Sequence, residues 1–471
     1  MAQERKARMQ NMNRQLPAEE RVALGKSQRK QTPRSSHSEW TPAPDRPDPI
    51  NLLQAQDEGR LQYLLPIKYG RMLASPFAFL RGSAVVMASD LAASPVSGPD
   101  VILCGDAHLA NFGVFATPER NLVFDINDFD EAYPGPWEWD LKRLAASAVV
   151  AGRDHGFKEK ACRHLAMLVS RSYRQAMRRF SEASILDVWY HYVDAESVLE
   201  VFIKYAGKSA KQARKTFKKA EARTSERTLE KLTQVVAGKR QIVNNPPLLE
   251  RLSHLSVEEY QQVTPQVVES AWTAYVNSLP EERRRLLARF RVADTALRVG
   301  GVGSVGTRCM IGLLEGDAGR DAIILQQKEA GPSALEPYLP KGDYASQAQR
   351  VVIGQRLMQA ASDIFLGWHQ STATGTQYYW RQLKDKKGSF DMQKLDERGM
   401  GTYLAICSLC LARAHARTGD AAAISGYLGS GSVFDDAIIR FAVAYADQTE
   451  RDYQALVDAV NTGRIAAETG I

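Results

Sequence analysis

The sequence predicts an α+β protein of two lobes, one strand-rich and one helix-rich, with the helix-rich lobe split in the sequence. Apolar residues recur at helical spacing between Trp137 and about Phe290, whereas short apolar runs separated by glycine turns dominate about 291–390. Helical spacing then returns from about Gly399. A chain of 471 residues is long enough for two such units, each with its own core.

Residues 1–48 are polar and charged, and they run into the proline-rich stretch TPAPDRPDPI. This composition is typical of a flexible basic tail, which supplies much of the net charge of +7. The remainder is only mildly basic, so nucleic-acid binding is allowed but not favoured. The N-terminal residues lack the apolar stretch of a secretory signal, and no run reaches the ~18 apolar residues of a membrane helix. We therefore expect a cytoplasmic protein with no membrane span.

Residues 49–290 are predicted to form most of the helical lobe. Residues 60–95 have helical spacing that is interrupted at SPFAFLRGS, and nearly every segment after Trp137 suits helix. Three short apolar runs predict strands: Val101–Leu103, Phe112–Phe115 and Leu122–Ile126. The basic stretch 208–223 is interpreted as a solvated helix face, with a site for an acidic partner or phosphate as the alternative.

Residues 291–390 are predicted to form the strand-rich lobe. Its strands are expected in RVADTALR, CMIGLLEG, DAIILQQKEA, IFLGWHQS and QYYWRQLKD, with a helix over Ser346–Ser362 after the third strand. Residues 391–471 complete the helical lobe with further helices. Cys407 and Cys410 lie in the first of these helices. Without a second cysteine pair they are interpreted as buried structural thiols, not zinc ligands.

The segment from Cys104 to Ser147 carries the densest set of residues suited to chemistry. Asp106 is followed by Asn111, and Asp128 and Asp130 come after an intervening pair of predicted strands. Phosphoryl transfer from ATP requires a carboxylate that orients the acceptor hydroxyl, and oxygen ligands that hold Mg²⁺ on the phosphates. These residues meet that requirement. The alternatives are ordinary acidic turns or a calcium loop, although the spacing and glycine of an EF-hand are absent.

This segment resembles the catalytic loop and metal-binding motif of aminoglycoside-phosphotransferase-like and protein-kinase-like enzymes. In those motifs Gly-Asp is followed by four residues and Asn, and later by Asp-Phe-Gly or Asp-Phe-Asp. The resemblance implies that Asp106 is the catalytic carboxylate, that Asn111, Asp128 and Asp130 are metal ligands, and that Asp128 is the principal one. ATP and Mg²⁺ are the cofactors that it implies.

Two neighbouring positions bear on this resemblance. Cys104 stands where these enzymes usually have the His of a His-Gly-Asp motif, which is mostly a structural residue. Trp139-Asp140-Leu141 resembles the buried Asp-Leu that braces the catalytic loop.

A glycine turn between two predicted strands forms the second candidate site. Gly301, Gly303, Ser304 and Gly306 lie in this turn, and Lys328 lies on the next strand. Backbone N–H groups of such a loop can approach phosphates and the lysine can pair with them, as in protein kinases. A tight β-turn is the alternative, and a dinucleotide site is disfavoured because the glycines open no helix. We therefore expect these five residues to bind the nucleotide.

The predicted helix over Ser346–Ser362 departs from the kinase pattern. In kinases this helix supplies a Glu that pairs with the nucleotide-binding lysine, whereas here the candidate positions hold glutamines. Either Glu329 or a residue from elsewhere pairs with Lys328, or the lysine is held differently. The difference leaves room for weak or altered catalysis.

The order of the motifs is the reverse of that in kinases, because Asp106 and Asp128 precede the glycine loop and its lysine. The expected fold is therefore a two-lobed protein-kinase-like fold with circularly permuted connectivity, which chains tolerate when old termini are close. In the phosphotransferases a helix with an ending similar to LARAHART directly precedes the catalytic strand. A competing interpretation places the catalytic residue in His415–Asp420, but no suitably spaced Asn or Asp-Phe-Gly-like motif follows. His415 is then a helix-end cap or a packed histidine.

From about Ile50 to Asp458 the chain resembles one bacterial family, domain of unknown function family 2252, in segments such as CGDAHLANFG, FDINDFDEA, QKEA and YADQTERDY. The family name carries no function. Arg81, in FLRG, is a candidate phosphate or substrate contact, with a structural arginine as the alternative. We expect an ATP- and Mg²⁺-dependent phosphotransferase that acts on a small-molecule or protein acceptor. The alternatives are a nucleotide-binding pseudokinase or nucleotidyl-transferring regulator, and a non-enzymatic basic interaction protein.

Overall fold

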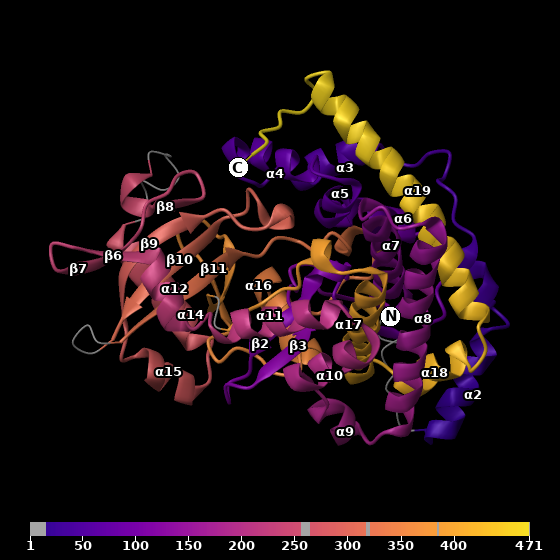
Figure 1. Cartoon of the computed structure of the whole chain (residues 1–471). Coiled ribbons are helices and arrows are strands. Elements are labelled where there is room, and N and C mark those ends of the chain that lie inside the picture. Colours follow the sequence, from indigo (N-terminus) through magenta and orange to yellow (C-terminus); the bar gives the residue numbers. More distant parts are fainter. Residues whose placement is uncertain (1–15, 256–263, 317–320, 384–385, 471) are drawn as a thin grey trace.

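The computed structural model describes residues 16–255, 264–316, 321–383 and 386–470. These residues form helices together with antiparallel sheets, which confirms the α+β class predicted from the sequence. Figure 1 shows the largest sheet at one side of the molecule and the long helices at the other. Within the described ranges, no helix has the length and apolar character needed to cross a bilayer.

The largest sheet has six antiparallel strands among the described residues, in the spatial order β12-β13-β11-β10-β9-β8. Their bounds are β8 Leu249–Arg251, β9 Arg291–Arg298, β10 Cys309–Glu315, β11 Ala322–Glu329, β12 Gly367–Gln370 and β13 Gln377–Gln382. Successive side chains of a strand point to opposite faces. Ile311, Leu313 and Ile324 therefore pack on one face of this sheet, whereas Leu314 and Leu325 pack on the other.

A segment that the sequence analysis placed in the helical lobe adds one strand to this sheet and packs further elements against it. The elements concerned are β8 itself, the hairpin strands β6 (Thr233–Val236) and β7 (Lys239–Ile242), and helices α14 (Pro265–Asn277) and α15 (Glu281–Leu287). Ile242 packs on one face of the sheet, and Tyr275 and Leu287 pack on the other. The predicted boundary near residue 290 is therefore too late, because the pairing of the short strand β8 with β9 leaves no periodic signal in the sequence.

The helix-rich part has one continuous core to which both ends of the chain contribute. Its main helices are α7 (Glu138–Asp154), α8 (Glu159–Glu182), α17 (Glu397–Thr418), α18 (Ala421–Leu428) and α19 (Val433–Asn461). Trp137 stacks on Tyr173 and also contacts Phe434, so residues far apart in sequence meet in this core. Cys407 and Cys410 are free thiols buried within α17.

Two groups of shorter helices surround this core. The N-terminal block, defined here as residues 49–91, contains α3 (Pro49–Gln56), α4 (Leu65–Met72), α5 (Pro76–Gly82) and α6 (Ala84–Leu91). The second group is α9 (Ile185–Tyr190), α10 (Ala195–Tyr205), α11 (Ser209–Glu221) and α12 (Ser225–Leu232). Helix α11 covers most of the basic stretch 208–223. It buries Ala213, Phe217 and Ala220 and exposes its lysines, as an amphipathic helix does.

Residues 16–48 depart from the prediction of a flexible tail. Helix α2 (Ala18–Gln28) lies against α18 so closely that a Cβ on Gly25 would be 1.9 Å from the Ala423 carbonyl oxygen. Arg29 donates hydrogen bonds to the carbonyl oxygens of Gly426 and Tyr427, near the C-terminal end of α18. These contacts use small residues and side-chain-to-backbone hydrogen bonds, so the polar composition does not reveal them. Residues 1–15 of the predicted tail lie outside the described residues.

Four short strands position the loops that carry the predicted catalytic residues. They are β1 (Asp100–Leu103), β2 (Phe112–Ala116), β3 (Leu122–Ile126) and β4 (Tyr133–Pro136), and the three strands predicted in this region are confirmed. β1 pairs with β4, and β2 pairs with β3. The loop after β1 and the loop after β3 are consequently brought side by side.

Candidate functional site

The loop after β1 is held by a carboxylate from helix α7. Asp140 accepts hydrogen bonds from the backbone N–H groups of Cys104 (2.7 Å) and Gly105 (2.9 Å). Gly105 has a positive φ of 80°, and a Cβ at this position would be 2.3 Å from the carbonyl oxygen of Glu131, so only glycine fits. His415 lies 3.2 Å from Asp140 and is completely buried, which places it behind the loop as a packed histidine.

Asp106 is the acidic residue at the tip of this loop. Its carboxylate lies 2.6 Å from Nε of Arg143, a buried residue of α7, and its side chain remains 22% exposed. His108 approaches the same carboxylate at 3.6 Å, and burial lowers the pKa of His108 to about 4. Asp106 is thus fixed from behind by a cation while part of its surface faces solvent.

Asn111 links the two acidic loops. Its side-chain amide nitrogen donates to the backbone carbonyl oxygens of Asp106 (3.1 Å) and Asp128 (3.2 Å). The amide nitrogen is therefore used for structure, while the residue lines the cleft described below. Because this one side chain donates to both loops, it holds the backbones of Asp106 and Asp128 at a fixed separation.

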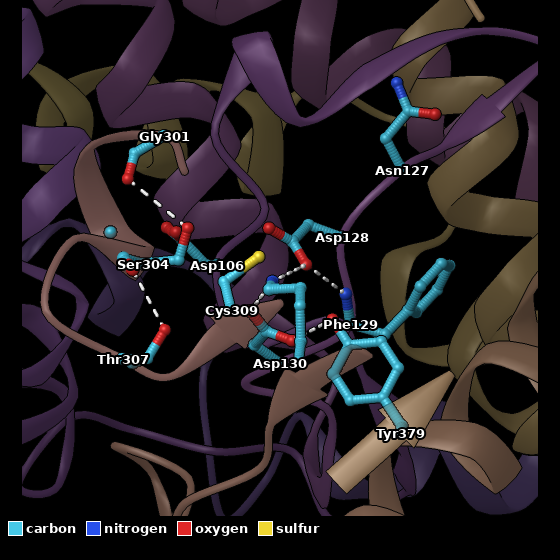
Figure 2. A network of polar contacts seen from close by, with 12 residues as sticks. Asp106, Asn127, Asp128, Phe129, Asp130, Gly301, Ser304, Thr307, Cys309 and Tyr379 are labelled. Atoms are coloured by element: carbon cyan, nitrogen blue, oxygen red, sulfur yellow. Dashed lines mark hydrogen bonds and ion pairs between the residues drawn. The ribbon is translucent and has the colours of Figure 1, made fainter. Parts of the chain in front are cut away.

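The two aspartates of the second loop differ in their surroundings. Asp128 is 48% exposed, and its carboxylate is capped by the Phe129 N–H (3.1 Å) with Lys328 at 3.8 Å. Asp130 forms an ion pair with Lys328. It also accepts a hydrogen bond of 2.6 Å from the Tyr379 hydroxyl (Figure 2). Each oxygen of Asp130 already has one partner, so Asp128 is the carboxylate that is more open to a ligand. The role of Asp130 as a metal ligand stays a prediction.

Lys328 lies on the central strand β11, and only 4% of its side chain is exposed. Burial alone would lower the pKa of Lys328, but Asp128 and Asp130 outweigh burial and hold the pKa well above its usual value. Glu329 pairs with Arg308 instead of with the lysine. The sequence left open whether Lys328 pairs with Glu329 or with a residue from elsewhere. The structure shows that its partner is Asp130.

Helix α16 (Gln347–Met358) contacts the acidic loop through an arginine. Arg350 donates to the backbone carbonyl oxygens of Ala132 (2.6 Å), Asp130 (2.9 Å) and Gly331 (2.9 Å). The helix therefore fixes the backbone of the loop that carries Asp130, and Asp130 in turn holds Lys328. Lys328 is thus held through Asp130 and not by a side chain of α16.

The glycine loop joins β9 to β10 and is held from outside by the N-terminal block. Arg60 donates to the carbonyl oxygens of Gly303 (2.9 Å) and Val305 (2.7 Å), and the carbonyl of Gly306 accepts from the Leu61 N–H (2.7 Å). Gly301, Gly303 and Ser304 line the cleft. Gly306 does not: its positive φ of 86° turns the chain toward Arg60, so its predicted role in binding the cofactor is not supported by its position.

Figure 2 shows Asp106, Asp128 and Asp130 gathered near the loop that carries Gly301 and Ser304. The cleft between them has an empty volume of about 1360 Å³, which includes open solvent. Apart from Gly306, every site residue predicted from the sequence lines this cleft.

Several residues of the cleft were missed by the sequence analysis. They are His108, Glu131, Arg298, Arg381 and Lys387, and Arg143 lies directly behind Asp106. Arg143 is three residues after Asp140, so it shares a helix face with it, and this spacing could have identified it. The others lie on strands or in loops, and they meet in the cleft only through tertiary structure.

The cleft has a surplus of positive charge. Among the described residues, the side chains of Arg81, Arg298 and Lys387 form no ion pair or hydrogen bond with one another or with their neighbours, although all three line the cleft. Burial, reinforced by Arg381, lowers the pKa of Lys387 to about 7. Removing a cation from water without a partner is costly, so these three groups point to an anionic ligand.

The acidic loops do not form a preassembled metal site. No cluster of three or more His, Cys, Asp or Glu side chains suited to a metal occurs among the described residues. Asp125, in the same acidic segment, is buried, and its carboxylate accepts hydrogen bonds from Arg413 and from the backbone N–H groups of Ile126 and Ala360. Asp128 and the side-chain oxygen of Asn111 fit a cation such as Mg²⁺, which takes one or two protein ligands together with phosphate oxygens.

The chain was also compared with known proteins. A family model described as an uncharacterized protein conserved in bacteria (DUF2252) matches residues 60–459. None of the curated proteins and none of the solved structures matches the chain. The match extends over most of the 471 residues, so the chain belongs to the DUF2252 family of bacterial proteins.

Proposed function

We propose that the protein is an ATP- and Mg²⁺-dependent phosphotransferase that acts on a hydroxyl-bearing acceptor. The observation that carries the proposal is the single cleft in which Asp106 and Asp128 face Lys328 and the glycine loop. The unpaired cations of this cleft complement a triphosphate, and the exposed carboxylate of Asp128 complements its metal ion.

The topology of the large sheet supports the proposal. The glycine loop joins β9 to β10, Lys328 lies on the adjacent strand β11, and helix α16 follows β11 in the chain. Protein kinases place a glycine loop, a lysine strand and a helix in this same order. We propose on this basis a protein-kinase-like fold.

The position of α17 supports circular permutation of that fold. Thr418, at the C-terminal end of α17, accepts a hydrogen bond of 3.1 Å from the Ile102 N–H of β1 through its hydroxyl. A Cβ on Gly419 would lie 2.6 Å from a methyl carbon of Val101. The helix that would directly precede the catalytic strand in an unpermuted chain thus ends beside β1.

Six residues of the cleft have a defined role in the proposed reaction. Asp128 and Asn111 would hold Mg²⁺, which neutralises charge on the phosphates when it is bound. Lys328 and the backbone of Gly301 and Gly303 would orient the phosphates. Asp106, fixed by Arg143, would orient the acceptor hydroxyl and accept its proton.

The transfer step conserves atoms and charge. The hydroxyl oxygen of the acceptor forms a bond to the terminal phosphorus of ATP, and the bond from that phosphorus to the β,γ-bridging oxygen breaks. ADP leaves with the electron pair of that bond, and the hydroxyl proton passes to Asp106. Positioning and charge neutralisation supply most of the rate in such reactions.

Asp106→Asn tests the proposal. The purified protein is incubated with Mg²⁺, a bacterial small-molecule extract and ATP labelled at the γ-phosphate or, in a parallel sample, at the α-phosphate. We expect the wild type to transfer the γ-label, and Asp106→Asn to lose about 10²–10⁴-fold of that activity while binding ATP normally. Full activity in Asp106→Asn would overturn the catalytic assignment, and transfer of the α-label would establish nucleotidyl transfer.

A nucleotide-binding pseudoenzyme is the second candidate, and one observation favours it. Lys328 is already paired with Asp130, which would have to share the lysine with a nucleotide phosphate. ATP binding that is lost in Asp128→Asn, with no transfer of either label above background, would support this candidate.

A further inference from the structure

A second cavity adjoins the cleft on the side of the N-terminal block. It has an empty volume of about 1430 Å³, including open solvent, and no role has been assigned to it above. Leu52 and Ala55 of α3 and Val85 of α6 form one wall, and Ala330, Ala334 and Tyr338, in the segment after β11, form another. These side chains are apolar or largely so, in contrast to the cationic cleft.

The two cavities share a wall at the reacting end of the cleft. Asp130, Glu131, Gly303 and Ser304 line both of them. Glu131 is also in contact with the catalytic loop, because a Cβ on Gly105 would be 2.8 Å from the Cβ of Glu131. A molecule in the second cavity would therefore lie beside the residue that precedes Asp106.

Every charged side chain that lines the second cavity already has a partner. Arg60 pairs with Asp57, Glu329 pairs with Arg308, and Asp130 pairs with Lys328. One carboxylate oxygen of Glu131 accepts a hydrogen bond of 2.6 Å from the Ala334 N–H. An anionic ligand would find no free cation among these residues, and a cationic ligand would find only the partly engaged carboxyl group of Glu131. An ion would therefore lose its hydration on entering with little compensation, so the cavity selects against ions.

Glu131 still offers one polar contact. Its second carboxylate oxygen forms no hydrogen bond with any described residue, and the side chain lines both cavities. Burial raises the pKa of Glu131. A carboxyl group with one free oxygen at the shared wall is suited to hydrogen-bond a single hydroxyl group.

We propose that this second cavity is the acceptor site and that it binds a small, uncharged alcohol with a largely apolar body, whose hydroxyl extends past the shared wall at Glu131 into the cleft, toward Asp106. This inference rests on the proposed phosphotransferase function and names its substrate class. The phosphates of ATP occupy the cleft, where cations lack partners. The acceptor occupies the cavity in which every charged side chain except Glu131 is ion-paired.

The test uses three probes that share one skeleton and differ in charge. They are 2-phenylethanol, phenylacetate and 2-phenylethylamine, and their binding to the full-length protein is measured by ligand-observed NMR at pH 7. Ala55→Trp fills the cavity from an exposed position on α3, and Gln54→Trp is the matched control on the same helix outside the cavity. ATP binding is measured on the same samples.

We expect 2-phenylethanol to bind at least 10-fold more tightly than either charged probe. Ala55→Trp should weaken its binding at least 10-fold, whereas Gln54→Trp should leave it unchanged and both variants should bind ATP as the wild type does. Equal or tighter binding of a charged probe, no binding of 2-phenylethanol, or no effect of Ala55→Trp would overturn the acceptor site. If ATP still binds in that case, the proposed function survives, whereas loss of ATP binding in the wild type would refute the function itself.

Discussion

Replacing Asp128 with asparagine tests whether this carboxylate binds a metal ion. Asp128 is 48% exposed, and its nearest cation is Lys328 at 3.8 Å, which is also paired with Asp130. Removing the charge of Asp128 therefore leaves no buried cation without a partner. The folded state should be nearly as stable in Asp128→Asn as in the wild type, because exposed ion pairs contribute about 0–1 kcal/mol.

The effect on ligand binding should be much larger. A ligand present at about 100 times its dissociation constant adds about 2.7 kcal/mol to the free energy of unfolding. Unfolding entropies of about 2.1 cal/mol/K per residue give roughly 1 kcal/mol/K for a chain of this length, so the wild-type melting temperature should rise by about 3 °C. The asparagine side chain of the variant would lack the negative charge that attracts Mg²⁺, and this rise should disappear.

The assay is a thermal-shift titration with ATP, carried out with and without Mg²⁺. Asp343→Asn is the control, because Asp343 is exposed and does not line the cleft. A Mg²⁺-dependent shift of equal size in the wild type and in Asp128→Asn would refute the assignment of Asp128 as the metal ligand. No shift in any variant would refute the nucleotide site as a whole.

Three further outcomes are expected. Lys328→Met should lower the affinity for Mg²⁺–ATP at least 10-fold in isothermal titration calorimetry, and an unchanged affinity would remove Lys328 from the site. Arg413→Met should lower the free energy of unfolding in urea by about 3–5 kcal/mol, because Asp125 would remain buried without its cation; a loss below about 1 kcal/mol would contradict this. Burial, with a contribution from Lys142, lowers the pKa of His37 to about 3. As the pH falls below about 6.5, the imidazole of His37 is therefore protonated in the unfolded chain but stays neutral in the folded chain. Stability should therefore fall between pH 7 and pH 5 by about 2 kcal/mol more in the wild type than in His37→Gln, and equal losses would contradict the shifted pKa.

The sequence determined the local elements around the site. Apolar runs bounded by glycines predicted β1, β2, β3 and the strands from β9 onward, and each is present. Side-chain alternation and turn residues act over a few neighbouring positions, so a single sequence contains enough information to specify them. The motif spacing also selected Asp106, Asn111, Asp128 and Lys328, which the fold brings to one cleft.

Contacts between distant residues were decided only by the tertiary structure. The sequence showed that α16 lacks a glutamate for Lys328, but not that Asp130 takes that place and that Arg350 holds the loop. It placed Gly306 with the other glycines, whereas contacts with the N-terminal block turn it away from the cleft. Such pairings depend on loop closure and on the packing of segments that are far apart in the chain.

Long-range contacts, which the sequence alone does not reveal, also decided the position of α2 and the shape of the second cavity. A polar composition predicted a flexible tail, yet Arg29 and Gly25 fasten α2 to α18. The cavity beside Glu131 is formed by five segments that no sequence motif connects. Residue types and short-range spacing thus determined which chemistry the chain can carry. Long-range packing decided which charges are compensated and which remain free to bind a ligand.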